Sequence, residues 1–387
     1  MRILQVHTRY REAGGEDAVT RAEAALLAGA GHDVVTYVVQ NPQQRVATAA
    51  SLLASAWNPV AAARLRAVAR RVRPDVAHVH NTWFALSPSV VAALDGAGVP
   101  VVMTLHNYRL LCANASLFRD GRPCEDCVGT HPWHGVRHRC YRRSVVGSAA
   151  AAATIAANRT LGTWNRHVGL FLALNEFARR RFVAGGLPAD KVRVKPNFVL
   201  DPGQRAAPPS RSRTVLYVGR LTPEKGVGDL LDAWRALAPA DLELVVIGDG
   251  PLRAELARRP PPAVRFAGRL DPKAVQEWML RSRALVFPTW LFEGQPISVL
   301  EAFACGLPVL ASRLGGNAEL VGRGGAGWLV PSRDPAALAR ALGALDDPGV
   351  DQAGERARRL YEQDFGDRRN LRLLEAAYRT GGAEDRA

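Results

Sequence analysis

Residues 287–312 read FPTWLFEGQPISVLEAFACGLPVLAS, and this stretch is the most informative one about the fold. It begins at the end of one apolar run, ALVFPTW, and finishes in a second, LPVLASR. The segment between them is apolar and opens at Pro296, a residue that suits the first turn of a helix. A buried run, a helix and a second buried run in succession are typical of a βαβ unit with parallel strands.

The same rhythm of apolar runs and longer Ala-, Arg- and Leu-rich segments extends over the chain in both directions. Before residue 200 the strand-like runs are RILQVH, DVVTYVV, DVAHVH, PVVMTLH, LFLAL and VRVKP. After residue 213 they are TVLYVGRL, LELVVIGDG, VRFAGRL, ALVFPTW, LPVLASR and GWLVP. The segments between them, such as 17–30 and 59–73, have helical character. This alternation predicts a doubly wound parallel sheet, formed twice.

The two sheets divide the chain into two α/β domains in tandem. Residues 201–213 are rich in Pro, Ser and Arg without clear periodicity, which is typical of a linker. We therefore expect domains at 1–200 and 214–364, with a C-terminal helix in 365–387. Facing doubly wound domains bind ligands at the carboxyl ends of their strands, in the cleft between them.

The charge of the chain is unevenly distributed. Of 387 residues, 51 are Lys or Arg and 36 are Asp or Glu, which gives a net charge of +15. Residues 1–200 hold 25 basic and 12 acidic residues, and residues 201–387 hold 26 and 24. A GC-rich coding bias toward Arg does not explain this asymmetry, so the first half is expected to attract an anionic partner such as a membrane surface or a phosphorylated substrate.

Nucleic acid fits the sequence poorly, because the basic residues lack interleaved aromatic runs and a recognised binding motif. The first residues contain no apolar signal region. The longest run of small apolar residues, 144–158, is shorter than the ~20 residues of a membrane span. We expect a cytoplasmic protein, with peripheral contact at the inner face of the membrane as an option.

Two motifs in the second half point to a phosphate-bearing ligand. YVGRLTPEKGVGDLLDA (217–233) places Arg220 and Lys225 in a strand-to-helix loop, where two cations and free helix N–H groups suit a diphosphate. VVIGDGP places Gly248 and Gly250 at a strand end, and such a turn allows close approach of the backbone to a flat ligand.

Two features of the first half also follow strands. Gly14 and Gly15 form a glycine-rich loop after the first strand, before a helix expected near Asp17. The loop is not GxGxxG, so the dinucleotide fingerprint is absent. His106 ends the strand VVMTL, a position that favours a functional role over a structural one.

The segment FEGQPISVLEA contains two acids eight residues apart. Glu293 lies in the loop before the expected helix and Glu301 lies inside it. The first helical N–H groups between them suit a phosphate. Acid, anion site and acid follow one another in the order of sugar hydroxyls, diphosphate and ribose hydroxyls in a nucleotide-sugar. The candidate donor contacts between the acids are Gly294, Gln295, Pro296 and Ile297.

In combination these motifs resemble the retaining glycosyltransferases of family four, which have the GT-B fold. The E-x7-E element matches Glu293 to Glu301, and the GRL-xxx-KG element matches Arg220 and Lys225. The glycine-rich first loop and the TLH strand end match as well, so the resemblance covers nearly the whole chain. It implies an enzyme that transfers a hexosyl group from a UDP-, GDP- or other nucleotide-sugar.

The resemblance also assigns roles. Glu293 and His106 would lie at the transferred sugar, Glu301 would bind the ribose, and Arg220 and Lys225 would hold the diphosphate. The following roles are implied for the remaining parts: Gly14 and Gly15 line the phosphate and acceptor side, the second domain binds the donor, the first domain binds the acceptor, and the last helix crosses back to the first domain.

The family usually works without a metal, and the sequence contains no Asp-x-Asp. The resemblance implies same-face attack, with the leaving phosphate helping to deprotonate the acceptor. The acceptor would be a saccharide, a lipid-linked oligosaccharide or a small molecule, in polysaccharide, glycolipid or metabolite biosynthesis. A nucleotide-sugar epimerase or hydrolase of the same fold, which would consume donor without an acceptor, is the alternative.

A cysteine-rich segment, residues 108–143, interrupts the first domain. Its spacing, C-x11-C-x2-C-x12-C, indicates a structural Zn²⁺ site. The candidate ligands are Cys112, Cys124, Cys127 and Cys140, with His131, His134 and His138 as spares. Free thiols, a redox-sensitive disulfide and an iron–sulfur cluster are alternatives. Cys305 is expected in the core.

Overall fold

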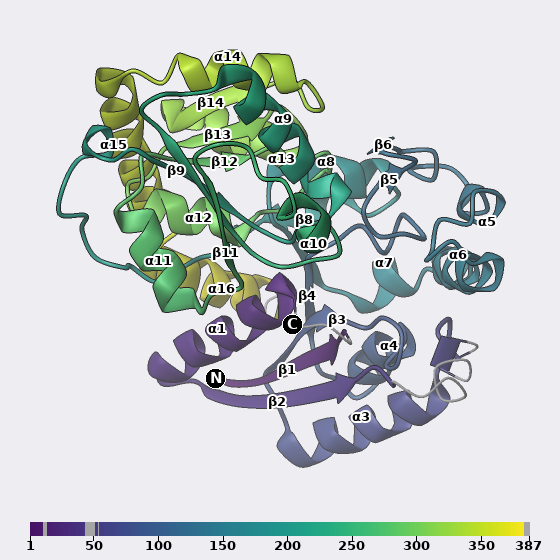
Figure 1. Cartoon of the computed structure of the whole chain (residues 1–387). Helices are drawn as coiled ribbons and strands as arrows, with labels where there is room; N and C mark the ends of the chain where they lie inside the picture. The colour runs from purple at the N-terminus through teal and green to yellow at the C-terminus, as the bar shows by residue number, and fades with distance from the viewer. Residues whose placement is uncertain (11–13, 43–50, 53, 383–387) are drawn as a thin grey trace. The chain divides into compact units, whose positions relative to one another are not determined.

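The computed structural model describes residues 1–10, 14–42, 51–52 and 54–382 (Figure 1). The chain forms two compact units. The first contains residues 1–119, 124–196 and 370–387, and the second contains residues 120–123 and 197–369. The C-terminal residues therefore belong to the same unit as the N-terminal ones.

The first unit is built on a six-stranded parallel sheet. Its order is β2-β1-β3-β4-β7-β8, so the chain winds outward from β1 in both directions. Strands β1, β3, β4 and β7 are buried over almost their whole length, as expected for a sheet covered on both faces. The strands are β1 (Arg2–Arg9), β2 (Asp33–Gln40), β3 (Val76–Asn81), β4 (Val101–Leu105), β7 (Leu170–Ala173) and β8 (Val192–Val194).

One face of this sheet packs against the first and the last helix of the chain. Leu27 from α1 joins Leu374 and Tyr378 from α16 in a single apolar cluster with residues of the sheet. The final helix is thus part of the first unit's core. The helices of this unit are α1 (Gly15–Gly29), α3 (Pro59–Val72), α4 (Ser89–Asp95), α5 (His134–Arg137), α6 (Val145–Thr160), α7 (Thr163–His167), α8 (Glu176–Ala184), η1 (Ala189–Lys191) and α16 (Asp367–Gly382).

The second unit repeats the architecture with the order β11-β10-β9-β12-β13-β14. Adjacent strands are again parallel. The strands are β9 (Thr214–Val218), β10 (Glu243–Ile247), β11 (Val264–Gly268), β12 (Ala284–Phe287), β13 (Val309–Ser312) and β14 (Gly327–Val330).

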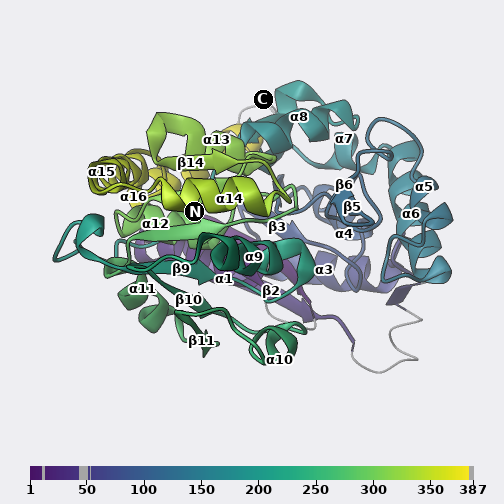
Figure 2. The ribbon, with the colours of Figure 1, turned by 45° about the horizontal axis from the view of Figure 1, so that its top comes forward.

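Successive side chains of the second sheet enter two different cores. On β9, Val215 and Tyr217 pack with α9 and α14, whereas Leu216 packs with α12 and α15 on the other face. Figure 2 shows α9 and α14 side by side. The alternation follows from the two-residue period of a strand and explains the continuous apolar runs. The helices are η2 (Pro209–Arg211), η3 (Pro223–Lys225), α9 (Val227–Leu237), α10 (Arg253–Leu256), α11 (Pro272–Leu280), α12 (Ile297–Ala304), α13 (Gly316–Gly322), η4 (Arg323–Gly325), α14 (Pro335–Gly343) and α15 (Asp347–Asp364).

The segment expected to be a linker, 201–213, is bonded to the second unit. Asp201 forms an ion pair of 2.6 Å with Arg358 on α15. Arg205 donates hydrogen bonds to the carbonyls of Gly306 and Ser282, at 3.1 and 2.7 Å. The compact unit accordingly begins at Asn197, earlier than the composition of the segment indicates.

None of the helices that the structure describes is long and apolar enough to cross a lipid bilayer.

Candidate functional site

In the second unit, the predicted donor-binding residues lie on loops that follow neighbouring strands. Arg220 and Lys225 follow β9, Gly248 and Gly250 follow β10, and Glu293 follows β12. Because these strands are parallel, their carboxyl ends lie at one edge of the sheet, where ligands bind in open α/β sheets.

Glycine allows the loops after β9 and β10 to touch through their backbones. Gly248 has φ +145°, and a Cβ added there would lie 1.9 Å from the carbonyl oxygen of Gly219. Gly250 has φ +158°, and its Cβ would lie 2.5 Å from the oxygen of Leu221. Any side chain at either position would collide with backbone, so both glycines are required by the fold as well as suited to a ligand.

A third glycine joins the loops after β9 and β12. Gly226 has φ +71°, and an added Cβ would lie 1.9 Å from the carbonyl oxygen of Pro288. The backbone N–H of Trp290 donates to the carbonyl of Glu224 at 2.8 Å. This close contact brings the predicted diphosphate ligand Lys225 next to the predicted sugar ligand Glu293.

Lys225 and Glu293 are directly paired. The ammonium Nζ lies 2.6 Å from Oε1 of Glu293, and the hydroxyl of Thr289 donates to the same oxygen at 3.0 Å. Both side chains keep part of their surface in solvent. The ion pair fixes the positions of a cation and an acid on the two loops, and both remain accessible to a charged ligand.

The neighbouring side chains fix the loops that present this pair. The indole N–H of Trp290 donates to Asp229 on α9 at 2.6 Å, and the Arg333 guanidinium lies 4.8 Å from the Trp290 ring. The hydroxyl of Tyr217 donates to the carbonyl of Arg220 at 3.0 Å. Tyr217 is buried, so its bond fixes the backbone of Arg220, whose side chain is exposed.

Helix α12 begins at Ile297, and Pro296 is its N-cap instead of lying in the first turn as expected. Among the described residues no side chain caps this N-terminus, which leaves its N–H groups oriented toward a potential anion. The carbonyl oxygen of the Gln295 side chain accepts a 2.5 Å hydrogen bond from the backbone of Asn197. Gln295 thus ties the approach to α12 to the start of the second unit.

Glu301 lies on α12, in the second turn. Burial raises the pKa of its carboxyl group to about 7. A carboxyl group in such a position gains from hydroxyl donors that replace the water it has lost. A separate cavity of about 380 Å³ lies at the other end of α12, lined by Cys305, Arg205 and Arg358 among others, and contains none of the predicted donor residues.

In the first unit, His106 directly follows β4 and contacts His80 on β3. The two rings stack, with His80 Nδ1 and His106 Nε2 3.0 Å apart. The amide nitrogen of Gln5 donates to the carbonyl of Thr20 at 3.0 Å and lies 3.2 Å from His80 Nε2.

These contacts determine the tautomers of both histidines. An amide nitrogen can only donate, so His80 Nε2 accepts from Gln5 and the proton of His80 is on Nδ1. His80 Nδ1 then donates to His106 Nε2, which leaves the proton of His106 on Nδ1. Burial, with a smaller contribution from the positive charge of Lys195, holds the pKa of His106 well below its usual value. His106 is therefore a neutral imidazole that offers an N–H donor.

The glycine-rich loop is held by an acid that the sequence did not single out. Helix α1 begins at Gly15, two residues before Asp17, with Gly14 as its N-cap. Asp17 accepts from the Gly14 N–H at 2.9 Å and from His7 Nε2 at 2.8 Å. No described atom would lie within 4 Å of a Cβ added at Gly14 or Gly15. The protein itself therefore leaves room for side chains there, unlike at Gly248.

Comparison with known proteins identifies the family. Residues 13–200 match the profile described as Glycosyltransferase Family 4, and residues 212–347 match that of Glycosyl transferases group 1. A D-inositol 3-phosphate glycosyltransferase of Acidothermus cellulolyticus is 30% identical over 90% of this chain and 83% of that protein. The chain belongs to glycosyltransferase family 4.

Another relative agrees with this family, and two solved structures agree with the predicted fold. A 2-deoxystreptamine N-acetyl-D-glucosaminyltransferase of Streptomyces fradiae is 31% identical over 75% of this chain and 67% of that protein. The crystal structure of Anabaena Alr3699/HepE in complex with UDP has a TM-score of 0.68 at 18% identity, covering 97% and 99% of the two chains. Sucrose-phosphate synthase from Thermosynechococcus elongatus has a TM-score of 0.71 at 17% identity over 98% of each chain. The fold is GT-B, as predicted.

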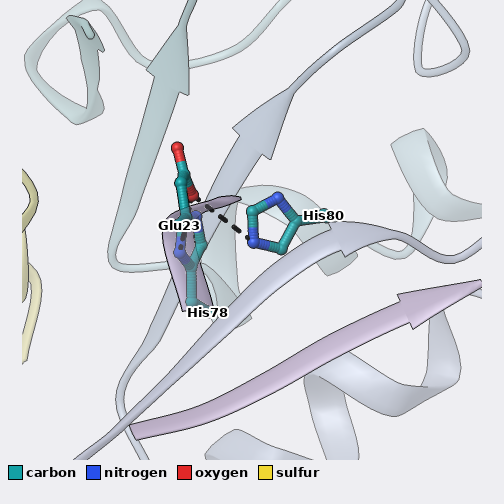
Figure 3. Close-up of side chains that lie close together, drawn as sticks. All are labelled: Glu23, His78 and His80. Carbon is teal, nitrogen blue, oxygen red and sulfur yellow. Dashed lines mark ion pairs between the residues drawn. The ribbon is translucent and has the colours of Figure 1, made fainter. Parts of the chain in front are cut away.

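The glycosyltransferase also contains a buried polar cluster that contacts His106 through His80 and that the sequence did not predict. Figure 3 shows Glu23 from α1 beside the rings of His78 and His80 from β3. The second carboxylate oxygen, Oε2, lies 3.8 Å from His78 Nδ1 and 3.7 Å from His80 Nε2, and Oε1 contacts the ammonium of Lys195. His78 also bonds Tyr378 of α16 at 2.9 Å.

The potential ligand atoms of Glu23, His78 and His80 lie within 4.8 Å of one another, which is close enough to bind a metal ion. The surroundings do not fit one. Lys195 already neutralises Glu23, and each ring nitrogen of the two histidines has a hydrogen-bond partner. We interpret the cluster as a polar core that supports His106, although Glu23 Oε2 has no hydrogen-bond partner among the described residues.

Two further residues near the predicted site residues, Thr289 and Glu16, could not be identified from the sequence alone. Thr289, which binds Glu293, stands four residues before it in FPTW, but nothing in the sequence indicates that contact. Glu16, in the first turn of α1, accepts a 2.5 Å hydrogen bond from Asn107, the residue after His106. Burial raises the pKa of Glu16 to about 7. An acid in the first turn of a helix is too common to be noticed without the fold.

The buried histidines predict that acid destabilises the first unit. Burial lowers the pKa values of all four, that of His78 to about 4. Between pH 6.5 and pH 4 the unfolded chain therefore binds more protons on these side chains than the folded chain does. As the pH is lowered, the free energy of unfolding decreases by roughly 1.4 kcal/mol per pH unit for each extra proton. Glu16 opposes this by up to one proton, because burial raises its pKa to about 7, and Glu301 does the same in the second unit. The four histidines are His7, His78, His80 and His106.

Urea unfolding at pH 7.5 and pH 5.5 measures the effect. We expect a lower midpoint at pH 5.5, and a smaller difference between the two pH values in His80→Gln than in His167→Gln, which lies outside the cluster. A midpoint that is equal or higher at pH 5.5 in the unchanged protein would contradict the assignment of neutral buried histidines.

Proposed function

We propose that this glycosyltransferase takes a sugar from a nucleoside diphosphate and transfers it to a hydroxyl acceptor with retention of configuration. The observation that carries the proposal is the direct pairing of Lys225 with Glu293 on two loops whose backbones touch at Gly226. One loop thereby supplies cations and the other an acid, at the edge of a parallel sheet where nucleotides bind.

The diphosphate would lie between Arg220, Lys225 and the N-terminus of α12. Arg220 and Lys225 supply two positive charges, and the α12 N–H groups supply a partial one. Together they can stabilise the negative charge that develops on the leaving diphosphate, which in other glycosyltransferases is the work of a divalent metal. The proposed catalysis therefore needs no metal ion. Solved neighbours of the same fold are described as complexes with UDP and UDP-glucose.

The two acids would bind opposite ends of the donor. When a diphosphate takes the charge of Lys225, Glu293 is released to accept hydrogen bonds from sugar hydroxyls. Glu301, with its carboxyl pKa raised to about 7 by burial, would accept from the ribose hydroxyls. A group that lacks solvent gains more from a new hydrogen bond than an exposed one.

The acceptor side is assigned to the first unit. His106 offers a neutral N–H donor to the transferred sugar, in the tautomer set by Gln5 and His80. Gly14 and Gly15 leave open space at the start of α1, so a ligand could approach the backbone there. We infer that the leaving phosphate takes the acceptor proton, because retention by same-face attack places the two on one side of the sugar.

The substitution Glu293→Ala tests the donor site. We expect kcat/KM for sugar transfer to fall by roughly 100-fold or more, as for the loss of other preorganised polar contacts in a transition state. The free energy of unfolding should change by no more than about 1 kcal/mol, because the Lys225 pair is partly exposed. A screen of UDP-, GDP-, ADP- and TDP-sugars by thermal shift first identifies the donor.

The control for this test is Glu277→Ala, which removes an exposed acid from α11 in the same unit. It should leave kcat/KM unchanged. Near-normal turnover of the Glu293 variant would rule out its place at the donor sugar. Consumption of donor at an equal rate without any acceptor would favour an epimerase or hydrolase. The anomeric configuration of the product, read by NMR, tests retention.

We further propose that the enzyme contacts anionic membrane surfaces through a basic apolar patch of the first unit. Val146 is 73% exposed, and Trp133 and Val145 are each 48% exposed. Four exposed arginines lie between them in the chain, and each adds about 1 kcal/mol of attraction near an anionic surface. The arginines are Arg137, Arg139, Arg142 and Arg143. Such a patch would bring the enzyme to a lipid-linked acceptor.

Cosedimentation with vesicles tests the patch. The enzyme should bind vesicles that contain phosphatidylglycerol and not vesicles of phosphatidylcholine alone. Val146→Glu should weaken this binding about tenfold, since it removes apolar surface from the contact and adds a negative charge. The matched control is Val60→Glu, at a valine on α3 that is 57% exposed. Equal binding of both variants would contradict the assignment.

A further inference from the structure

The segment between β4 and α6 is long and has little secondary structure. It covers residues 106–144, here called the cysteine segment, and contains only β5 (Phe118–Arg119), β6 (Arg122–Pro123) and α5 (His134–Arg137). Loops of this length without regular structure are uncommon in compact domains. The segment is therefore expected to have another source of order.

Its backbone also adopts unfavourable conformations. Of the eleven non-glycine residues with positive φ in the described chain, six lie in the cysteine segment. Left-handed conformations of such residues persist only where surrounding contacts impose them. The six are Ala115, Leu117, Asp120, Arg139, Arg142 and Arg143.

The four cysteines of the segment line one small cavity. Cys112 and Cys127 are buried, and Cys124 and Cys140 are half-buried. None of them is joined in a disulfide in the described chain. The cavity measures about 10 Å³, which is room for one small ion and not for a cluster of iron and sulfide.

Backbone hydrogen bonds hold the cysteines in place. The N–H of Cys112 donates to Tyr108 at 2.8 Å, that of Cys124 to Leu117 at 2.7 Å, and that of Cys140 to Gly135 at 2.9 Å. Each of these partners belongs to the cysteine segment, so three of the four cysteines are held by backbone contacts within it. The sequence spacing and the spatial arrangement therefore agree.

We propose that Cys112, Cys124, Cys127 and Cys140 bind one structural Zn²⁺ ion. Each thiol releases a proton and donates a sulfur lone pair, so four Zn–S bonds form and four protons leave. In the described chain no three of these sulfur atoms lie within 4.8 Å of one another. The side chains must rotate into the cavity to reach the Zn–S distance of about 2.3 Å.

Nearby charges fit a tetrathiolate site, which carries a net charge of −2. Arg119 lines the cavity and pairs with Asp126 at 2.8 Å. Arg159 donates to the carbonyls of Cys127 and Thr130. Positive groups of this kind stabilise the thiolates around the ion.

The ion would fix the loop that leads out of the active-site region. Asn107 and Arg109 stand between His106 and Cys112. Asn107 donates to Glu16 at 2.5 Å, and the Arg109 guanidinium lies 4.6 Å from the Trp83 ring. A zinc ion at Cys112 would anchor the far end of this stretch, which makes the ion structural and not catalytic.

Metal analysis of the full chain tests the proposal without reference to activity. After purification without an affinity tag and with reductant, mass spectrometry of the metals should find one zinc per chain. The double variant Cys124→Ala/Cys127→Ala should hold less than a fifth of that, and Cys305→Ala, at a core cysteine, should keep it. Zinc retained by the double variant, or iron in place of zinc, would overturn the proposal.

A second measurement serves if the double variant does not fold. Titration of the unchanged protein with an organomercurial should release one zinc, detected with a chromogenic indicator, as four thiols react. A chelator should also open the arginines of the cysteine segment to trypsin, and added zinc should protect them again. A protein that takes up no zinc under reducing conditions, or that contains disulfides by mass, would overturn the proposal.

Discussion

Parallel strands place all their carboxyl ends at one edge of a sheet, and the functional design of each unit depends on that constraint. In the second unit the loops after β9, β10 and β12 meet there through backbone contacts of glycines. An added Cβ would lie 1.9 Å from a carbonyl oxygen at both Gly226 and Gly248. These contacts leave little freedom for the loops, so the charged side chains on them are positioned before any ligand arrives.

The two units use buried charge in different ways. In the second, the Lys225–Glu293 pair is partly exposed, so a diphosphate can replace the carboxylate without leaving an unpaired buried charge. In the first, Glu23 and Lys195 are almost wholly buried, and removal of either would leave an uncompensated charge. The Lys225–Glu293 pair is suited to exchange with a ligand. The Glu23–Lys195 pair is suited to the support of His80 and His106.

The sequence predicted both sheets, and it placed the candidate donor residues on loops that the structure brings to one edge of the second sheet, because these signals are local. Apolar runs, a proline before a helix and glycines at strand ends all follow from the chain itself. The sequence could not show that Thr289 binds Glu293, that Gln5 sets the tautomer of His106, or that Tyr378 reaches His78 across 300 residues. Those contacts depend on how separate strands and helices come together. The start of α1 and the cap at Pro296 were misplaced by one or two residues, as expected where helix ends depend on geometry.

Calorimetry can measure directly whether the loop after β9 binds phosphate. Among UDP, GDP, ADP and TDP, the nucleotide that binds most tightly should be compared with its own monophosphate, in the unchanged protein and in Arg220→Met. We expect the diphosphate to bind at least about tenfold more tightly than the monophosphate, as for a charged hydrogen bond. Arg220→Met should remove most of that difference and leave the monophosphate unaffected, while Arg269→Met changes neither. An undiminished preference for the diphosphate in Arg220→Met would contradict phosphate binding by this loop.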